Sequence, residues 1–272
     1  MRIGIVSMMK NPMGFETWLR YHRKCGIFKF YLRIEDSDHL KKISNHSSWH
    51  ACIYAEYTTG EQNYAHIMIR QLSFIKKIIS IAKKDGCTHL LHIDDDELLY
   101  CPDGSEKFEL FLNTSPQTAS CISLTNYEAV FKKTMSEDIF DARYFRTNPT
   151  TYTSYVNGKS MGVLAHSDVY PLGPHRFSGE EVKVPAKIAV ILHYESACFF
   201  RWKRKFEEYS KKATDVDVQR IPFIFYRESI HGVRNHSDMN VLYAIWKKWK
   251  VVKSITDQEK KRGLVYIKVK HI

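Results

Sequence analysis

The segment Thr88-His-Leu-Leu-His-Ile-Asp-Asp-Asp-Glu-Leu-Leu99 joins a short apolar run to a dense group of acidic side chains. Residues 88–93 have the length and apolar content of a buried strand, and the acids begin at its carboxyl end. Because side chains alternate along a strand, we expect Asp94 and Asp96 to share one side. Paired carboxylates of this kind hold a hard divalent cation, with water and substrate phosphates as further ligands. The segment therefore predicts a site for a metal-bound diphosphate, with an acidic capping turn as the simpler alternative.

Strand-like and helix-like patterns alternate on either side of this segment. The expected elements are strands at 2–8, 28–34, 51–57, 88–93, 120–126, 159–166 and 187–193, and helices at 15–24, 64–82, 108–112 and 197–212. This alternation favours an α/β fold with a mostly parallel sheet, in which ligands bind beyond the carboxyl ends of the strands. The acidic group falls at that edge. The polar stretch 132–153 is expected to be a loop that shapes an acceptor site or a lid.

The last part of the chain carries a basic and aromatic helical pattern. Leu242, Trp246 and Trp249 recur at helical spacing beside lysines 247, 248 and 250. We expect this helix to pack its aromatic face on the core and leave its lysines in solvent, rather than lie on an anionic membrane. The predicted organisation is one nucleotide-sugar-binding catalytic domain at 1–212 and an extension at 213–272 that packs on it.

The charge and composition of the chain indicate which classes of binding partner to expect. The chain has 41 Lys and Arg against 30 Asp and Glu, a formal net charge of +11, which favours anionic ligands. No zinc-finger, helix-turn-helix or RNP pattern accompanies this charge, so no nucleic-acid partner is expected. The sequence shows no run of about 18 apolar residues and no signal-peptide pattern, and its six scattered cysteines indicate reduced thiols. We therefore expect a cytoplasmic protein without a transmembrane segment and with at most weak membrane-surface contact.

Several short motifs follow one another over residues 1–209. They are Val6-Ser-Met-Met-Lys-Asn11, Glu16-Thr-Trp-Leu-Arg-Tyr-His22, Asp94-Asp-Asp-Glu-Leu98, Gly173-Pro-His175, and His193-Tyr194 with Lys205. In this order they resemble the family 92 and family 2-like glycosyltransferases. The chain departs from the family at Pro12, where a glutamate usually stands.

The resemblance implies a single GT-A type domain that binds a UDP-sugar with Mn²⁺ or Mg²⁺ and transfers the sugar, with inversion, to a glycan hydroxyl. Without an anchor or signal, it fits a soluble enzyme of a microbe or a large DNA virus. Asp96 is the expected first metal ligand, and Asp94 contacts the metal, directly or through water, or the ribose. His193 is the second expected ligand, with a hydrogen-bonded core histidine as the alternative.

Further donor contacts are expected near the strand ends, each with a plain structural alternative. They are Lys10 (or a surface lysine), Glu35 and Asp36 (or solvated turn acids), Arg70 and Lys159 as weaker phosphate candidates, Asp95 (or an acid turned away from Asp94), and His175 (or a loop anchor). Inverting transfer also needs a carboxylate base. Asp168 is the first candidate, with Glu128, Glu180 and Glu181 in reserve.

Two other function classes stay open from the sequence. A nucleotidyltransferase or two-metal nuclease also uses paired aspartates on a metal-bound phosphate. A nonenzymatic polyanion-binding protein would use the net positive charge, and its binding would be salt-sensitive.

Overall fold

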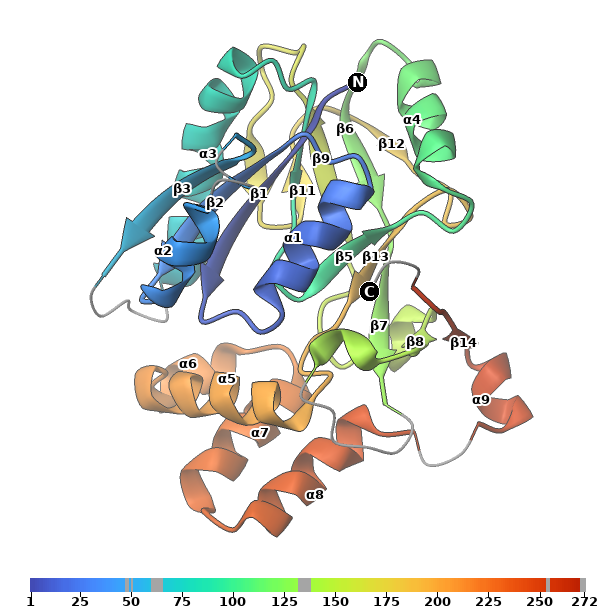
Figure 1. Cartoon of the computed structure of the whole chain (residues 1–272). Coiled ribbons are helices and arrows are strands. Elements are labelled where there is room, and N and C mark those ends of the chain that lie inside the picture. Colours follow the sequence, from blue (N-terminus) through green and yellow to red (C-terminus); the bar gives the residue numbers. More distant parts are fainter. Residues whose placement is uncertain (47–48, 50, 60–65, 132–137, 253–254, 270–272) are drawn as a thin grey trace.

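The computed structural model describes residues 1–272 except 47–48, 50, 60–65, 132–137, 253–254 and 270–272 (Figure 1). Its described elements form an α/β fold with a mainly parallel sheet, a smaller second sheet beside it and a group of helices at the end of the chain. The predicted fold class, with helices flanking the main sheet and a helical C-terminal part, is confirmed.

The main sheet orders its described strands as β12, β6, β9, β4, β1, β2 and β3. Their bounds are β1 Ile3–Lys10, β2 Lys29–Glu35, β3 Ile53–Thr58, β4 His89–His92, β6 Ala119–Leu124, β9 Lys159–Val163 and β12 Glu180–Lys183. Strands β3, β2, β1 and β4 pair in parallel, whereas β9 runs antiparallel to both β4 and β6. The parallel strands therefore end at one edge, and β9 begins there.

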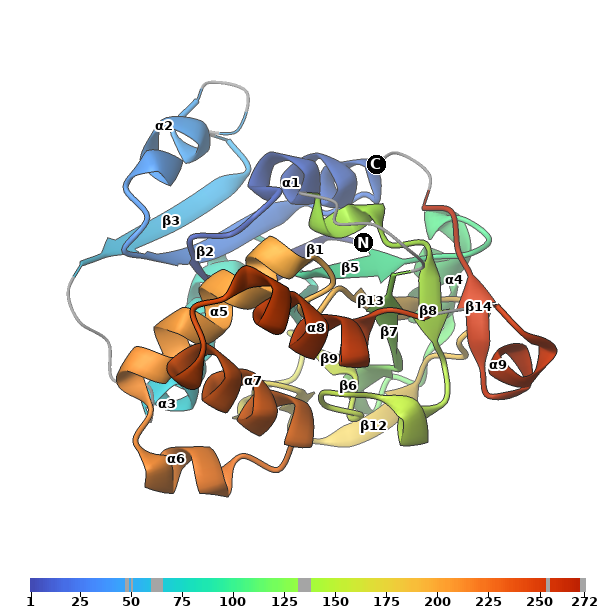
Figure 2. The same ribbon diagram turned by 90° about the horizontal axis from the view of Figure 1, so that it is seen from below.

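Helices cover both faces of this sheet. Helix α3 (Ile67–Lys84) packs with Val6 on one face, while α1 (Phe15–Lys24) packs with Ile5 on the other. Figure 2 shows the two helices on opposite sides of β1. Successive β1 side chains point to opposite faces, which explains the continuous apolar pattern of this strand. The predicted start of α3 at residue 64 lies outside the described residues.

Some helices and strands of the structure were not predicted, and others differ in length from the prediction. Helix α2 (His39–Ser44) and strand β5 (Glu97–Tyr100) had no periodic signal, and α4 spans Ser105–Thr114. The expected strand at 120–126 divides between β6 and β7 (Asn126–Val130), which enter different sheets. The expected loop at 132–153 contains β8 (Tyr144–Arg146) and the short 3₁₀ turns Ile139–Asp141 and Pro149–Thr151, and its first six residues lie outside the described part.

The second sheet orders its described strands as β14 (Leu264–Tyr266), β8, β7, β13 (Val190–His193) and β5. Helix α1 fixes the edge strand β5 through hydrogen bonds. The Trp18 indole N–H donates to the Glu97 carbonyl at 2.8 Å, and the Leu99 N–H donates to His22 Nε2 at 3.2 Å. Burial lowers the pKa of His22 to about 3, so its neutral ring can accept that bond. The Trp-x-x-x-His motif thus holds the strand that follows the acidic group.

The last part of the chain is helical; its first four helices lie across the carboxyl ends of the main-sheet strands, whereas the last helix lies beside β14 (Figure 1). The helices are α5 Phe199–Lys212, α6 Asp215–Arg220, α7 Ile224–Asn235, α8 Met239–Lys250 and α9 Asp257–Lys261. On α8, the fully buried Trp246 packs against Phe199, with ring centroids 5.9 Å apart, and donates to the Ser196 carbonyl at 2.8 Å. Among the residues that the structure describes, no helix is both long and apolar enough to cross a bilayer.

One expectation about α8 was wrong. Lys247 and Lys248 are exposed, but Lys250 is fully buried and donates to Glu128 at 2.9 Å. The end of α8 turns toward the second sheet, so its last lysine enters the interior, where a carboxylate compensates its charge.

Candidate metal and donor site

A cavity of about 310 Å³ lies where the carboxyl ends of β1, β2 and β13 and the acidic turn meet α5. It brings together many of the side chains predicted for a donor site: Lys10, Glu35, Arg70, Asp94, Asp95, Asp96, His175 and His193. Parallel strands deliver their carboxyl ends to one edge, and α5 closes that edge from the outside. The sheet topology therefore creates the site from segments distant in the sequence.

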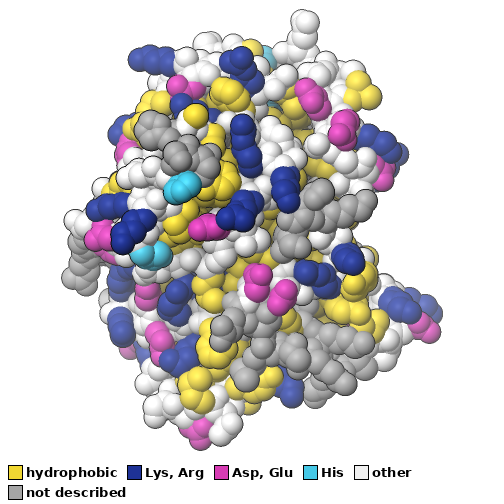
Figure 3. Space-filling view, in the orientation of Figure 1, with side chains coloured by type: hydrophobic (Ala, Val, Ile, Leu, Met, Phe, Trp, Pro, Cys, Tyr) yellow, Lys and Arg dark blue, Asp and Glu magenta, His cyan; other side chains and the backbone are white. Residues whose placement is uncertain are grey.

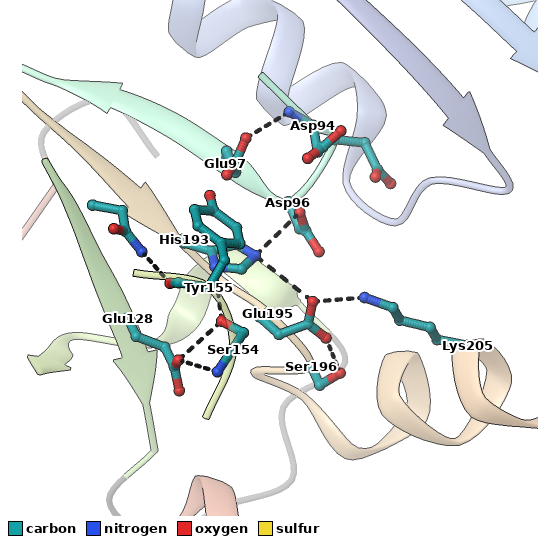
Figure 4. A network of polar contacts seen from close by, with 12 residues as sticks. Asp94, Asp96, Glu97, Glu128, Ser154, Tyr155, His193, Glu195, Ser196 and Lys205 are labelled. Atoms are coloured by element: carbon teal, nitrogen blue, oxygen red, sulfur yellow. Dashed lines mark hydrogen bonds and ion pairs between the residues drawn. The ribbon is translucent and has the colours of Figure 1, made fainter. Parts of the chain in front are cut away.

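Three buried residues form a group of metal-ligand type. Asp96, His193 and Glu195 each offer one ligand atom, and these atoms lie within 4.8 Å of one another. His193 Nε2 is 3.9 Å from Asp96 Oδ1 and 3.7 Å from Glu195 Oε2. Figure 4 shows the three side chains pointing toward one another from the acidic turn, the end of β13 and the residues just after it. Glu195 was not among the predicted ligands.

The chemistry of this group fits a divalent cation. The Asp96 Oδ2 atom accepts from Arg201 at 3.0 Å, and the other oxygen, Oδ1, faces the imidazole. Burial lowers the pKa of His193, which favours the neutral ring that can act as a ligand. Burial raises the pKa of Glu195, but the charge of Lys205, which donates to it at 2.6 Å, outweighs burial and holds the pKa well below its usual range. One nitrogen and two carboxylates suit Mn²⁺ and similar metals.

Asp94 lines the cavity but lies apart from this group, and its predicted contact with the metal or the ribose stays a prediction. Its Oδ2 accepts from Lys159 Nζ at 2.7 Å, and its Oδ1 accepts from Gln71 at 3.3 Å. The strand β4 ends at His92, so the acids occupy a turn before β5 rather than the strand itself. Strand alternation therefore does not govern them, and Asp94 and Asp96 face different partners.

Lys159 occupies a different place from the predicted phosphate contact. Its ammonium is fully buried and lies 2.7 Å from Asp94 and 3.2 Å from Glu97. Burial raises the pKa of Glu97 to about 8, even though Lys159 opposes this shift. Because the charge of Lys159 is engaged by carboxylates, it orients Asp94 from behind the cavity wall.

Asp95 is bound by helix α5, although it lines the cavity. Both of its oxygens accept from Arg201, each at 3.0 Å. Arg201 is itself buried and also reaches Asp96, so one guanidinium holds two consecutive acids of the turn. This bidentate pair is a strong, directional contact. Asp95 therefore anchors α5 to the turn, and its predicted contact with the donor stays a prediction.

The predicted residues at the ends of β1 and β2 form ion pairs, one of them with the predicted Arg70 of α3. Glu35 accepts from Arg70 at 3.0 and 3.1 Å and from Arg33 at 3.0 Å. Lys10 lies 3.3 Å from Asp36 and 3.3 Å from Glu208 of α5. The cavity is lined by Glu35, Arg70 and Lys10. Asp36 is not part of the lining and forms an ion pair with Lys10.

His175 combines the two roles considered for it. Its Nδ1 contacts the Gly158 carbonyl at 3.0 Å, as a loop anchor would, and its ring lines the cavity. Tyr155, which was not predicted, lies between His175 and His193 with ring centroids 4.2 and 4.6 Å away. This aromatic stack forms a wall beside the metal-ligand group.

The carboxylates predicted as base lie elsewhere. Since β9 runs antiparallel to β4, it carries the chain away from the cavity edge, and Leu164 bonds to Thr88 before β4 begins. Asp168 follows there, exposed at the opposite edge of the sheet. The exposed Glu180 and Glu181 pair with the start of β6 at that same edge. Glu128 is fully buried in the second sheet, where donors surround its carboxylate.

Sequence reasoning missed the polar face of α5, apart from Lys205, which it named as part of a motif. Within the cavity this helix contributes Arg201, Arg204, Lys205, Glu208, Tyr209 and Lys212. Their spacing follows one helical face, opposite the buried Trp202 and Phe206. The amphipathic pattern was visible, but a polar helix face usually meets solvent, and only the fold places this one over the strand ends.

Comparisons with known proteins find a distant likeness in sequence. No family model matches the chain. Two Arabidopsis thaliana proteins, glycosyltransferase-like At2g41451 and At3g57200, are each 24% identical to it, over 252 and 254 residues. The matches cover 75% of this chain, and 55% and 48% of the plant proteins, so the chain spans about half the length of the curated relatives it matches.

Solved structures resemble the chain only weakly. A cytidylyltransferase from Leptospira borgpetersenii aligns with a TM-score of 0.29 and 11% identity, covering 61% of each chain. A 4-diphosphocytidyl-2C-methyl-D-erythritol synthase aligns with a TM-score of 0.31 and 8% identity, covering 99% of this chain and 94% of the other. These values are too low to support a conclusion about function. By its sequence, the chain is a distant homologue of plant glycosyltransferase-like proteins.

Proposed function

We propose that the chain is a metal-dependent glycosyltransferase that moves a sugar from a UDP-sugar to a glycan hydroxyl with inversion. The observation that carries the proposal is the convergence of Asp96, His193 and Glu195 in a cavity at the carboxyl ends of parallel strands. The distant homology to glycosyltransferase-like proteins supports the same reaction class.

Asp96, His193 and Glu195 would hold Mn²⁺ or Mg²⁺. Bound there, the cation supplies positive charge that stabilises a departing diphosphate without proton transfer. Arg201 and Lys205 keep the two carboxylates oriented through hydrogen bonds of 3.0 and 2.6 Å. Arg204, Lys212 and Lys10 face the same cavity and add the positive charge that a diphosphate requires.

Other side chains that line the cavity suit the nucleoside and the sugar of a donor. The Glu35 and Arg70 pair lies at the end of β2 with polar atoms for a nucleoside, and the Tyr155 and His175 rings offer a surface on which a sugar can pack. The cavity carboxylate with the largest exposed side-chain fraction is Glu208, at 33%, which makes it a better candidate base than the distant Asp168.

The direct test is a thermal-shift screen of UDP, UDP-glucose and UDP-xylose, each in Mn²⁺ and in EDTA. A ligand at about 100 times its Kd stabilises the folded protein by about 2.7 kcal/mol, so binding raises Tm. We expect stabilisation only with Mn²⁺, together with slow hydrolysis of the UDP-sugar when no acceptor is present. Equal stabilisation in EDTA would contradict a metal-bridged diphosphate.

Two assays separate this proposal from the alternatives. Release of pyrophosphate from UTP and a sugar phosphate would indicate a nucleotidyltransferase, and proton NMR of a transfer product reports whether the anomeric configuration is inverted. For the polyanion-binding alternative, Figure 3 shows Lys and Arg side chains interleaved with Asp and Glu on the face drawn there. The described side chains of that face form no continuous basic surface. Salt-sensitive nucleic-acid binding without nucleotide-sugar binding would reverse this choice.

A further inference from the structure

A buried chain of polar groups connects the end of α8 to the imidazole of His193. Lys250 Nζ donates to Glu128 Oε1 at 2.9 Å, and Ser154 Oγ donates to Glu128 Oε2 at 3.0 Å. The same Ser154 oxygen lies 3.4 Å from His193 Nδ1. All four residues are buried, and Figure 4 shows Ser154 between Glu128 and His193.

The donors around Glu128 determine where the protons lie. Its carboxylate also accepts from the Thr153 hydroxyl and from the backbone N–H groups of Thr153, at 2.8 Å, and Ser154, at 3.1 Å. An ionised carboxylate only accepts, and a serine hydroxyl has one proton to donate. Since Ser154 gives that proton to Glu128, its oxygen accepts from His193. The proton of the neutral ring is then on Nδ1, and the lone pair is on Nε2.

We infer that Ser154, Glu128 and Lys250 are positioning residues that fix His193 in the tautomer whose Nε2 lone pair faces Asp96 and Glu195. That orientation is the one a metal ligand needs, because the partner of the distal ring nitrogen sets the tautomer of a ligating histidine. The metal half of this inference rests on the proposed function, whereas the tautomer is a property of the metal-free protein.

Lys250 has a specific part in this chain. It is the cation paired with the fully buried Glu128, at 2.9 Å, and keeps that carboxylate in its accepting form. Lys250 ends α8, 122 residues from Glu128. Through Lys250, α8 therefore contributes to the Glu128 side of the chain of contacts that ends at His193, in addition to packing on the core.

The first test measures the tautomer without metal. In protein labelled with ¹⁵N-histidine, long-range ¹H–¹⁵N NMR distinguishes the two neutral tautomers, and the His193→Gln variant identifies the His193 signals. We expect the Nδ1–H pattern in the wild type, its retention in Ser154→Thr, and a shift toward Nε2–H in Ser154→Ala. An Nε2–H pattern in the wild type, or an unchanged pattern in Ser154→Ala, would overturn the inference.

The second test measures Mn²⁺ affinity by electron paramagnetic resonance. Loss of such an outer partner typically weakens metal binding by roughly 10 to 100-fold, and we expect this of Ser154→Ala and Lys250→Met. Lys247→Met is the matched control, since it removes the same charge from an exposed position of α8 and should leave the affinity unchanged. If Lys250→Met fails to fold, Ser154→Ala decides.

The two tests separate failure of the inference from failure of the proposed function. If the wild type binds no Mn²⁺, the proposed function is contradicted. The NMR measurement of the His193 tautomer then tests the positioning role without the metal. If the wild type binds Mn²⁺ and Ser154→Ala binds it equally tightly, only the positioning role is contradicted.

Discussion

Two buried carboxylate clusters lie near each other and differ in how their oxygens are satisfied. Around Glu128, backbone N–H groups, hydroxyls and Lys250 donate to both oxygens. In the Asp96, His193 and Glu195 group, the protein also donates to the carboxylates, through Arg201, Ser196, Lys205 and Tyr226. One atom of metal-ligand type from each of the three residues nevertheless lies within 4.8 Å of the other two. Burial of charge is costly unless it is compensated. The Glu128 cluster contains no comparable group of ligand atoms among the described residues, whereas the second cluster does, and this difference supports the proposed cation site at Asp96, His193 and Glu195.

The largest expected effect is on activity, in Asp96→Ala. A bound metal contributes several kcal/mol of charge stabilisation, and about 4 kcal/mol corresponds to roughly a thousandfold in rate. The fold should persist, because Arg201 keeps both of its bonds to Asp95. Mn²⁺-dependent UDP-sugar hydrolysis and urea unfolding measure the two quantities. If Asp96→Ala is strongly destabilised, Asp96 has a structural role like that of Glu128.

The largest effect on stability is expected for Lys250→Met. Removing one partner of a buried ion pair leaves an uncompensated charge and costs about 3–5 kcal/mol of unfolding free energy. Chemical denaturation measures this cost, and the double variant Glu128→Gln with Lys250→Met should lose less than the sum of the single variants. Additive losses would show that the two residues act independently.

His193→Ala should fall between these extremes. It removes one ligand of three, so we expect Mn²⁺ affinity to fall by roughly 10 to 100-fold while the unfolding free energy changes less than in Lys250→Met. Activity should recover in part at high Mn²⁺ concentration. Full activity of this variant at limiting Mn²⁺ would remove His193 from the group.

Acid should weaken the Glu128 cluster over a defined pH range. Burial raises the pKa of Glu128, but Lys250 and Thr153 outweigh burial and lower it to about 2. A depressed carboxyl pKa contributes stability that is complete above the unfolded value of about 4.3 and is lost as the pH falls through the folded value. The difference in unfolding free energy between wild type and Glu128→Gln should therefore shrink from about pH 5 to pH 2. A constant difference would contradict the ionised state of Glu128.

The smallest effect is expected for Asp168→Asn, which should leave transfer unchanged because Asp168 lies at the far edge of the sheet. Glu208→Gln is the matched comparison within the cavity, and it should lower the rate of transfer while UDP binding persists. Measured rates and UDP affinities of the two variants distinguish these outcomes. Loss of transfer in Asp168→Asn would restore the original assignment.

The sequence by itself determined the local elements. Apolar periodicity is a short-range property, so β1, α1, β2, α3 and β4 could be recognised without knowledge of their neighbours. The acids after β4 could likewise be placed at the ligand-binding edge of a parallel sheet. Asp96 and His193, named from separate motifs, lie in one group in the structure.

Only the tertiary structure decided which groups meet. The turn before β5 separates Asp94 from Asp96, and the antiparallel direction of β9 brings Lys159 to the cavity edge and takes Asp168 away from it. Lys250 reaches Glu128 across 122 residues. Strand direction and ion pairing at such separations depend on the whole packed chain, because they leave no periodic signal in the local sequence.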